Sequence, residues 1–193
     1  FIIYTMHIFY TPLISGNTAV LSEEESRHCI RVLRLTQGEI IQLIDGKGGF
    51  YKADIIEADP KRCVVNIVER QPEYGKRNFL LSIGIAPTKN IDRFEFFLEK
   101  TTEIGIDTVS PLICERSERK NTNTERLEKV ITSAVKQSIK AYHPILKEDI
   151  CFDDFIRQEF HGQKFIAHCI HNDKLELKSV YKKGSNALVL IGP

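Results

Sequence analysis

The chain has 193 residues, of which 42% are hydrophobic and 27% charged, a composition typical of a globular protein with one large domain or two small ones. Because the formal net charge is only +1, a polyanionic partner would have to be met by local basic patches rather than by the field of the whole molecule. No apolar run approaches the roughly 18 residues of a membrane span, which argues against a membrane protein.

The five cysteines are Cys29, Cys63, Cys114, Cys151 and Cys169. They are odd in number, widely spread and without a C-x-x-C pair, so we expect buried reduced thiols in a cytoplasmic protein, with no disulfide framework and no zinc site. The histidines lack a metal-ligand spacing such as H-x-x-x-H, and we expect no metal. The sequence contains no G-x-G-x-x-G, P-loop or G-x-S-x-G motif, which argues against a standard dinucleotide site, an NTPase and an α/β-hydrolase.

The first part of the chain is predicted to be mostly β with one helix. Strands are expected at residues 7–10, 39–44, 50–57 and 62–69. Between the middle two lies Asp45-Gly46-Lys47-Gly48-Gly49, a strong hairpin signal whose glycines are most simply turn glycines. Ser22 and Glu25 form an S-x-x-E capping box that opens a helix expected to run to about residue 35. This part therefore forms a compact β-barrel or meander carrying one helix.

Residues 70–78 are polar, contain a proline and a glycine, and are interpreted as a linker. After the linker, the pattern changes to alternating strands and helices. Strands are expected at residues 79–86, 108–114, 165–169 and 187–191, and helices at residues 91–104 and 123–142. This alternation predicts an α/β unit with a parallel sheet and helices on its faces.

The chain ends in an apolar run from Ala187 to Ile191, followed by Gly192 and Pro193. Such a run is typical of a strand buried on both faces of a parallel sheet, and ligands bind beyond the carboxyl ends of these strands. We therefore expect a binding site here, and also a further segment of the natural protein after Pro193. At the other end, the five residues before Met6 are interpreted as an addition or a misplaced start.

Arg27, Arg31 and Arg34 are four and three positions apart in the first predicted helix, which places them within about 60° of one another on an α-helix. They form either a solvated face or a stripe that contacts phosphates, since guanidinium groups match phosphate oxygens. Lys47, in the predicted hairpin loop, is a further candidate for a phosphate contact.

Basic residues also gather where the α/β part would carry its site. These residues are Lys89, Arg93, Arg116 and Arg119. The last two follow the strand 108–114, at the carboxyl edge of the predicted sheet. Lys100 and Glu103 lie three positions apart on the helix 91–104, and they either pair on the surface or take part in function.

Five segments, taken in order, resemble the RsmE family of bacterial methyltransferases, which modify N3 of a uridine in 16S ribosomal RNA. They are RHCIRVLRLTQGE (27–39), IDGKGGFYKADI (44–55), EKTTEIGIDTVSPLICERSER (99–119), AVKQSIKAYHP (134–144) and LVLIGP (188–193). Each segment is modest alone, but their order and spacing make the resemblance specific and extend it along nearly the whole chain.

The resemblance implies an α/β protein with two domains: a PUA-like β-barrel at residues 6–72 that holds RNA, and a SPOUT domain with a deep trefoil knot at residues 78–193. Family members bind S-adenosylmethionine in the knot and usually act as homodimers. The family motif continues beyond I-G-P, so the knot segment is expected to be missing after Pro193. Lys140 stands where the family usually has arginine, a swap of cations that is tolerated unless the contact is bidentate.

The chemistry that the resemblance implies is a direct methyl transfer to N3 of a uridine that is unpaired or extruded. Leu190, Ile191, Gly192 and Pro193 are the expected cofactor contacts. RNA contacts are expected from Arg27, Arg31, Arg34, Lys47, Lys89, Arg93 and Arg116. The sequence does not identify the group that takes the N3 proton, so no catalytic residue is assigned.

Two alternatives stay open. In one, the chain is a non-catalytic RNA-binding protein whose α/β part serves only for dimerisation. In the other, it is a SPOUT methyltransferase that acts on tRNA or 23S ribosomal RNA. A PUA-like domain ahead of the knot, together with residues 27–35, favours the RsmE assignment and hence 16S ribosomal RNA, or the small ribosomal subunit, as partner.

Overall fold

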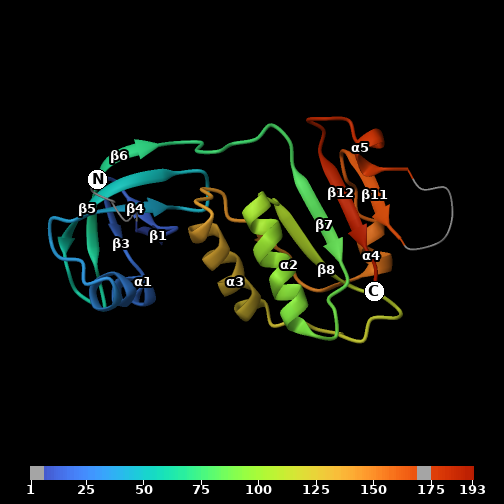
Figure 1. The fold of residues 1–193 in the computed structure, drawn as a ribbon, viewed down its shortest axis with the longest axis horizontal. Helices are drawn as coiled ribbons and strands as arrows, with labels where there is room; N and C mark the ends of the chain where they lie inside the picture. Colours follow the sequence, from blue (N-terminus) through green and yellow to red (C-terminus); the bar gives the residue numbers. More distant parts are fainter. Residues whose placement is uncertain (1–6, 169–174) are drawn as a thin grey trace. The chain divides into compact units, whose positions relative to one another are not determined.

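The computed structural model describes residues 7–168 and 175–193, and Figure 1 shows their helices and strands. The chain divides into two compact units. The first contains the residues up to Lys76 together with Thr132–His143, and the second contains Arg77–Ile131 and Pro144–Pro193. Each unit has its own six-stranded sheet.

The first unit is built on a curled sheet with the strand order β1-β4-β5-β6-β3-β2. The strands are β1 (Ile8–Tyr10), β2 (Ile14–Ser15), β3 (Thr18–Val20), β4 (Ile40–Ile44), β5 (Phe50–Glu57) and β6 (Val64–Gln71). The predicted hairpin is confirmed, because β4 and β5 pair antiparallel up to Ile44 and Phe50. Thr11, just after β1, donates its hydroxyl to the carbonyl of Val20 in β3, so the sheet curls back on itself.

Alternate side chains of this sheet form the core of the first unit, as expected for strands with one buried face. The buried pairs are Ile41 and Leu43 of β4, Ala53 and Ile55 of β5, and Val65 and Ile67 of β6. The sequence pattern did not predict β2 and β3, because strands of two and three residues are too short to show alternation. Ala19 of β3 nevertheless lies in the same core.

The helix opened by Ser22 is confirmed, but it is not a regular α-helix. The Ser22 hydroxyl accepts a hydrogen bond from the amide of Glu25 at 3.2 Å, and α1 spans Glu23–Arg27. A π-helical turn, η1 (His28–Val32), follows directly. The prediction of an α-helix to about residue 35 is therefore wrong.

Packing explains this departure from α-helical geometry. Leu33 and Leu35 both pack against the core of the first unit. In a continuous α-helix, residues two positions apart point about 200° apart, so one of these leucines would face solvent. The wide turn, in which the amide of Leu33 donates to the carbonyl of His28 at 3.0 Å, and a φ of 58° at Arg34 bring both leucines inward.

A buried ion pair within the first unit joins α1 to the segment Thr132–His143. Lys136 Nζ donates to Glu25 Oε1 at 2.6 Å, and the side chains are 30% and 9% exposed, respectively. The second carboxylate oxygen of Glu25 is buried, and no hydrogen bond to it is recorded among the described residues. Loss of the lysine would therefore leave a buried carboxylate without a counter-charge.

The second unit contains a parallel sheet, which confirms the α/β class. The strand order is β10-β8-β7-β12-β11, with β9 also paired to β8. The strands are β7 (Leu81–Ile85), β8 (Thr108–Ile113), β9 (Ile145–Leu146), β10 (Ile150–Cys151), β11 (Gln163–Ala167) and β12 (Ala187–Ile191). The sequence pattern missed the two-residue strands β9 and β10, which lie beside β8.

The helices after α1 and η1 are α2 (Ile91–Ile104), α3 (Thr124–Gln137), α4 (Phe152–Ile156) and α5 (Leu177–Val180). α2 has the predicted bounds and buries Phe94 and Leu98. In Figure 1 it crosses one face of the parallel sheet. α3 ends before the predicted residue 142, because Ile139 has a left-handed φ of 55° and the amide of Lys140 turns back to the carbonyl of Val135. No helix in the described ranges is long and apolar enough to cross a membrane.

β12 is less buried than its apolar sequence predicted. Ala187 and Leu188 are buried, whereas the remaining three residues of the strand are only half-buried. The prediction of a strand buried on both faces is therefore right for the first two positions only. The last three keep apolar surface accessible next to the carboxyl edge of the sheet.

The described cysteines are free thiols. Cys29 and Cys63 are buried, as predicted, and a hydrogen bond between them together with burial raises the pKa of Cys29. The prediction of burial is wrong for Cys114, which is half-buried, and for Cys151, which is exposed. Cys169 lies outside the described residues.

Replacing Lys136 by methionine is expected to lower the free energy of unfolding by about 3 kcal/mol, because Glu25 then keeps a buried charge without a partner. The double variant Glu25→Met/Lys136→Met removes both charges and is expected to recover most of the loss. Urea unfolding at pH 7 measures both effects. Arg157→Met, which breaks the exposed pair with Asp154, is the control and should change stability by less than about 0.5 kcal/mol. A Lys136→Met protein as stable as the parent would contradict a buried pair.

Candidate functional site

The parallel strands of the second unit end at a shared carboxyl edge. Ile85 of β7 pairs with Ile191 of β12 and with Pro111 of β8, and Ile191 also pairs with Ala167 of β11. The chain winds from β7 to β8 on one side and later returns to place β12 on the other side. Ligands of open α/β sheets bind outside the carboxyl ends at such a reversal of strand order. Residues 190–193 lie at this point.

The two strand ends at this reversal are tightly joined. A Cβ on Gly84 of β7 would lie 2.9 Å from the end of the Leu190 side chain, so a larger residue there would force that side chain to shift. The amide of Ala86 donates to the carbonyl of Ile191 at 3.0 Å.

Arg119 fastens the loop after β8 to the loop after β7. Its guanidinium donates hydrogen bonds to the carbonyls of Lys89 at 2.7 Å and of Thr88 at 3.2 Å. Ser117 shapes the same loop, because its hydroxyl accepts from the amide of Cys114 at 2.9 Å. The sequence predicted that Arg119 lies at this edge but did not predict what it binds. The carbonyls that it binds belong to a loop about 30 residues earlier in the chain.

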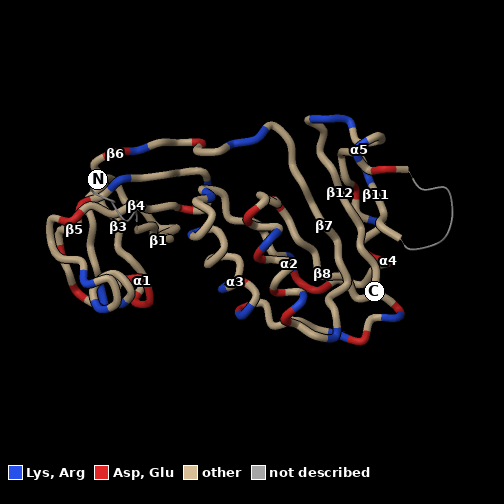
Figure 2. The backbone as a smooth tube through the Cα atoms, viewed as in Figure 1, with Lys and Arg blue, Asp and Glu red and all other residues tan. Residues whose placement is uncertain are grey.

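The other basic residues predicted for the second unit lie at the same edge and are exposed. Lys89 pairs with Glu118 at 2.8 Å, and this hydrogen bond raises the pKa of Lys89. Arg93 lies in the first turn of α2 and Arg116 in the loop after β8, and neither has a recorded ion pair within residues 7–168 and 175–193. Figure 2 shows that basic and acidic residues mix along the loop after β8.

Lys100 and Glu103 form a surface pair, which was the simpler of the two interpretations of their spacing. Lys100 Nζ lies 2.9 Å from Glu103 and 2.7 Å from Glu99. These carboxylates raise the pKa of Lys100. The cluster is therefore accounted for without a ligand.

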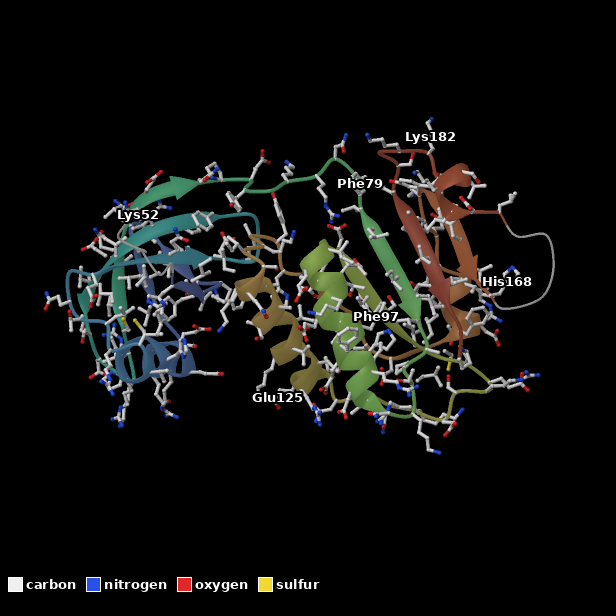
Figure 3. The ribbon with its side chains drawn as sticks, viewed as in Figure 1. Lys52, Phe79, Phe97, Glu125, His168 and Lys182 are labelled. Atoms are coloured by element: carbon white, nitrogen blue, oxygen red, sulfur yellow. The ribbon has the colours of Figure 1, made fainter. Side chains whose placement is uncertain are left out.

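The histidines and the acidic residues do not gather into a metal site in the part of the chain that the structure describes. It contains no group of three or more His, Cys, Asp or Glu side chains that could hold a metal ion. His168 follows β11 at the outer part of the sheet, as Figure 3 shows, whereas His171 lies outside the described residues.

The three arginines of the first unit are exposed, but they do not share a regular helix. Arg27 ends α1 and pairs with Glu23 at 2.9 Å, Arg31 lies in η1, and Arg34 follows η1. Figure 2 shows acidic residues beside the basic ones along this helix. The angle of about 60°, which holds for an ideal α-helix, does not apply to Arg34. Arg31 and Arg34 have no ion pair recorded with the described residues.

The loop from Asp45 to Gly49 is held together by one carboxylate. Asp45 accepts hydrogen bonds from the amides of Lys47 at 2.7 Å and Gly49 at 2.8 Å, and from the hydroxyl of Tyr51 at 2.9 Å. Burial and this last hydrogen bond raise the pKa of Tyr51. Lys47 itself is exposed, and its backbone bridges to Tyr142.

Each glycine of this loop leaves room for an aromatic ring. An added Cβ would lie 3.0 Å from the Tyr10 ring at Gly46, 2.4 Å from the Tyr142 hydroxyl at Gly48, and 2.2 Å from the Tyr51 hydroxyl at Gly49. The interpretation as turn glycines is therefore incomplete, although Gly46 and Gly48 do have positive φ angles of 76° and 102°. No pattern in the sequence indicates this packing, because Tyr10 and Tyr142 are distant from the loop along the chain.

Comparisons with known proteins agree with this arrangement. Residues 76–193 match the RNA methyltransferase domain family, and residues 21–68 match the RNA methyltransferase PUA domain family. The ribosomal RNA small subunit methyltransferase E of Synechocystis sp. is 25% identical over 171 residues, which cover 88% of this chain and 55% of the relative. The corresponding proteins of Aquifex aeolicus and Rickettsia conorii are also similar. This chain spans 55 to 66% of the length of these three relatives.

Solved structures show the same fold. A probable rRNA-methyltransferase from Porphyromonas gingivalis is 35% identical, with a TM-score of 0.89 over 97% of this chain and 80% of that one. A protein from Legionella pneumophila, solved in complex with the bound cofactor SAM, is 25% identical, with a TM-score of 0.84 over 97% of this chain and 80% of that one. The arrangement of strands and helices is therefore shared with methyltransferase structures.

Replacing Arg119 by alanine is expected to loosen the loop after β7, because two hydrogen bonds from a charged donor are removed. Hydrogen–deuterium exchange at the amides of Asp92 and Arg93, which bond to Asn90 in that loop, should accelerate by about 5- to 30-fold. Arg116→Ala is the matched control, since no hydrogen bond of its side chain is recorded with the described residues. Equal exchange in the two variants would show that Arg119 does not fasten the loops.

Proposed function

The chain belongs to the RsmE family of RNA methyltransferases, and we propose on this basis that it transfers a methyl group from S-adenosylmethionine to N3 of a uridine in 16S ribosomal RNA. The observation that carries the proposal is the order of the two domain matches. A PUA domain of RNA methyltransferases precedes a methyltransferase domain whose sheet reverses its strand order next to residues 190–193. An RNA-holding part and a cofactor-holding part are the two things that the reaction requires.

The proposal includes the architecture implied by the family. Residues 6–72 are assigned to a PUA-like barrel and residues 78–193 to a SPOUT domain, with the knot formed in the full-length protein. The segment Thr132–His143 is a special case, because it lies within the second range and packs with the first unit. We further propose that the full-length protein is a cytoplasmic homodimer.

The residues at the reversal point fit S-adenosylmethionine in the contacts that they offer. Leu190 and Ile191 provide half-buried apolar surface, and Gly192 and Pro193 provide exposed backbone. Nucleoside-like ligands are usually held by apolar walls together with a few backbone N–H and C=O groups. When bound, the cofactor supplies a methyl group carried on a positively charged sulfur. These four residues are the proposed cofactor contacts, and Arg119 holds the neighbouring loops in place.

Seven exposed basic residues are the proposed contacts to RNA phosphates: Arg27, Arg31, Arg34, Lys47, Lys89, Arg93 and Arg116. Arg27 and Lys89 each pair with a glutamate, so a phosphate would have to displace a carboxylate there. The other five have no ion pair recorded with the described residues, and their charge is therefore available. Phosphate contacts of this kind position RNA without reading its sequence.

The main contribution of the chain to the proposed reaction is to position uridine N3 against the methyl group of the cofactor. Uridine N3 lies on the Watson–Crick edge, so the base has to be unpaired or extruded before N3 can reach the methyl group. Holding N3 in line with that methyl group removes much of the entropic part of the barrier. N3 also loses its proton, and no residue is assigned to accept it.

Deleting the gene is expected to remove 3-methyluridine from small-subunit ribosomal RNA, because the proposed reaction is the source of that methyl group. Nucleoside mass spectrometry of purified 16S, 23S and transfer RNA measures the loss, and expression of the full-length gene should restore the mark. Loss of a methyl mark from another RNA would support a different substrate. An unchanged profile from a protein that still binds RNA would support the non-catalytic alternative.

The triple variant Arg27→Ala/Arg31→Ala/Arg34→Ala is expected to bind RNA more weakly, with a smaller dependence on salt. Removing each phosphate contact should reduce the slope of log K against log salt by about 0.7, so the reduction should reach about 2. Cofactor binding should not change. Lys52→Ala/Lys61→Ala/Arg62→Ala removes three other exposed charges of the first unit and is the control. If the parent and the arginine variant have the same slope, these arginines are only a solvated face.

A further inference from the structure

Aromatic side chains gather around the Asp45–Gly49 loop from four separate parts of the first unit. They are Tyr10, Phe50, Tyr51, Tyr74, Tyr142 and His143. We propose that three of them, Phe50, Tyr74 and Tyr142, form a platform on which an unpaired base of the RNA stacks, next to the cation of Lys47. This proposal rests on the proposed function, because it takes RNA as the ligand, and it adds a site for a base to the phosphate contacts.

The centre of the platform is a pair of nearly parallel rings. Phe50 begins β5, and its ring stacks on that of Tyr74 with centroids 4.7 Å apart and an angle of 23° between the ring planes. Both residues are half-buried, so neither is fully covered by the rest of the first unit. A base can extend such a stack, and stacking tolerates any base because every base has a π-face.

Backbone hydrogen bonds fix the rings before any ligand arrives. The amide of Tyr74 donates to the carbonyl of Gly48 at 2.8 Å, and the amide of Gly48 donates to the carbonyl of Ala141 at 2.8 Å. The ring of Tyr142 lies over Gly48, where a Cβ would be 2.4 Å from its hydroxyl. Tyr74 and Tyr142 are thus attached to the same glycine. A platform fixed in this way loses little conformational entropy on binding.

One cation at the platform is available to a phosphate. Lys47 is exposed, and no ion pair with it is recorded in the described ranges. Lys76 pairs with Glu73, which raises the pKa of Lys76, so this pair adds no net charge. The carboxylate of Asp45 is engaged by three donors within the loop. Aromatic rings beside a cation such as Lys47 are typical of surfaces that bind single-stranded nucleic acid.

The other aromatic rings around the loop, those of Tyr10, Tyr51 and His143, have structural roles and are not part of the proposed platform. Tyr51 packs against the core of the first unit, and its hydroxyl donates to Asp45. Tyr10 lies over Gly46 and contacts the ring of His143, with centroids 5.3 Å apart. Phe50 and Tyr74, in contrast, are absent from the buried core cluster and pack on each other.

The test compares Tyr74→Leu with Tyr74→Phe in the full-length protein. Leucine keeps apolar contact with Phe50 but removes the π-face, whereas phenylalanine keeps the ring. The probes are an oligouridylate of roughly 12 nucleotides and a ribose-phosphate chain of the same length without bases, measured by fluorescence anisotropy. Tyr74→Leu is expected to weaken binding of the oligouridylate by about 5- to 100-fold and to leave binding of the baseless chain unchanged. Tyr74→Phe is expected to bind both probes as the parent does.

Two controls make the result specific. Phe97→Leu removes a half-buried ring of the second unit that stacks on Phe94, and it should not affect either probe. Lys47→Ala should weaken both probes, since it removes charge and not a ring. A Tyr74→Leu protein that keeps the circular dichroism of the parent and binds oligouridylate equally well would overturn the platform. Formation of 3-methyluridine by the parent is scored separately, so failure of the platform is distinguishable from failure of the proposed function.

Discussion

The candidate cofactor site depends on the parallel pairing of β12 with β7 on one side and β11 on the other. This pairing brings Ile85, Ala167 and Ile191 into one line, so the chain leaves three strands at the same edge. On one face of this pairing, Gly84 leaves room for the side chain of Leu190. The hydrogen bond from Ala86 to Ile191 then fixes the two strand ends against each other. These contacts fix the point at which the chain leaves β12 toward Gly192.

The sequence predicted those parts of the second unit in which a repeated physical pattern extends over several residues. The helix 91–104 was found with its bounds, because its apolar residues follow the helical period. In the structure, Asn90 and Gly105 cap its ends. Parallel pairing was predicted from the alternation of strands and helices. The partners of Arg119 could not be predicted, because two backbone carbonyls carry no signal in the sequence. The same holds for the short strands β9 and β10, which are specified by their neighbour β8.

In the first unit, tertiary contacts override local patterns twice. The Ser22 hydroxyl caps a helix as predicted, although Glu25 pairs with Lys136 and does not complete the capping box. Burial of both Leu33 and Leu35 then converts the second half of the helix into a π turn. The glycines of the Asp45–Gly49 loop have the composition of a simple hairpin, and the structure uses them to admit rings from distant residues. In both places the local conformation depends on contacts between residues that are distant along the chain. A single sequence does not reveal these contacts. π turns of this kind are frequent at functional sites, and this one carries Arg31.

The distribution of charge constrains how this protein can hold a polyanion. Its net charge is only +1, and two of the seven proposed phosphate contacts already pair with glutamates. Under the proposed function, the five cations without recorded ion pairs in the described ranges would contribute a salt-sensitive part of the RNA affinity. Methylation at one position, however, requires that a single base be held in register with the cofactor, and phosphate contacts do not distinguish one nucleotide from the next. Contacts with the bases themselves must supply that register. Stacking on the rings around Gly48 can hold an unpaired base in one plane but tolerates any base, so the choice of nucleotide has to come from hydrogen bonds to base edges.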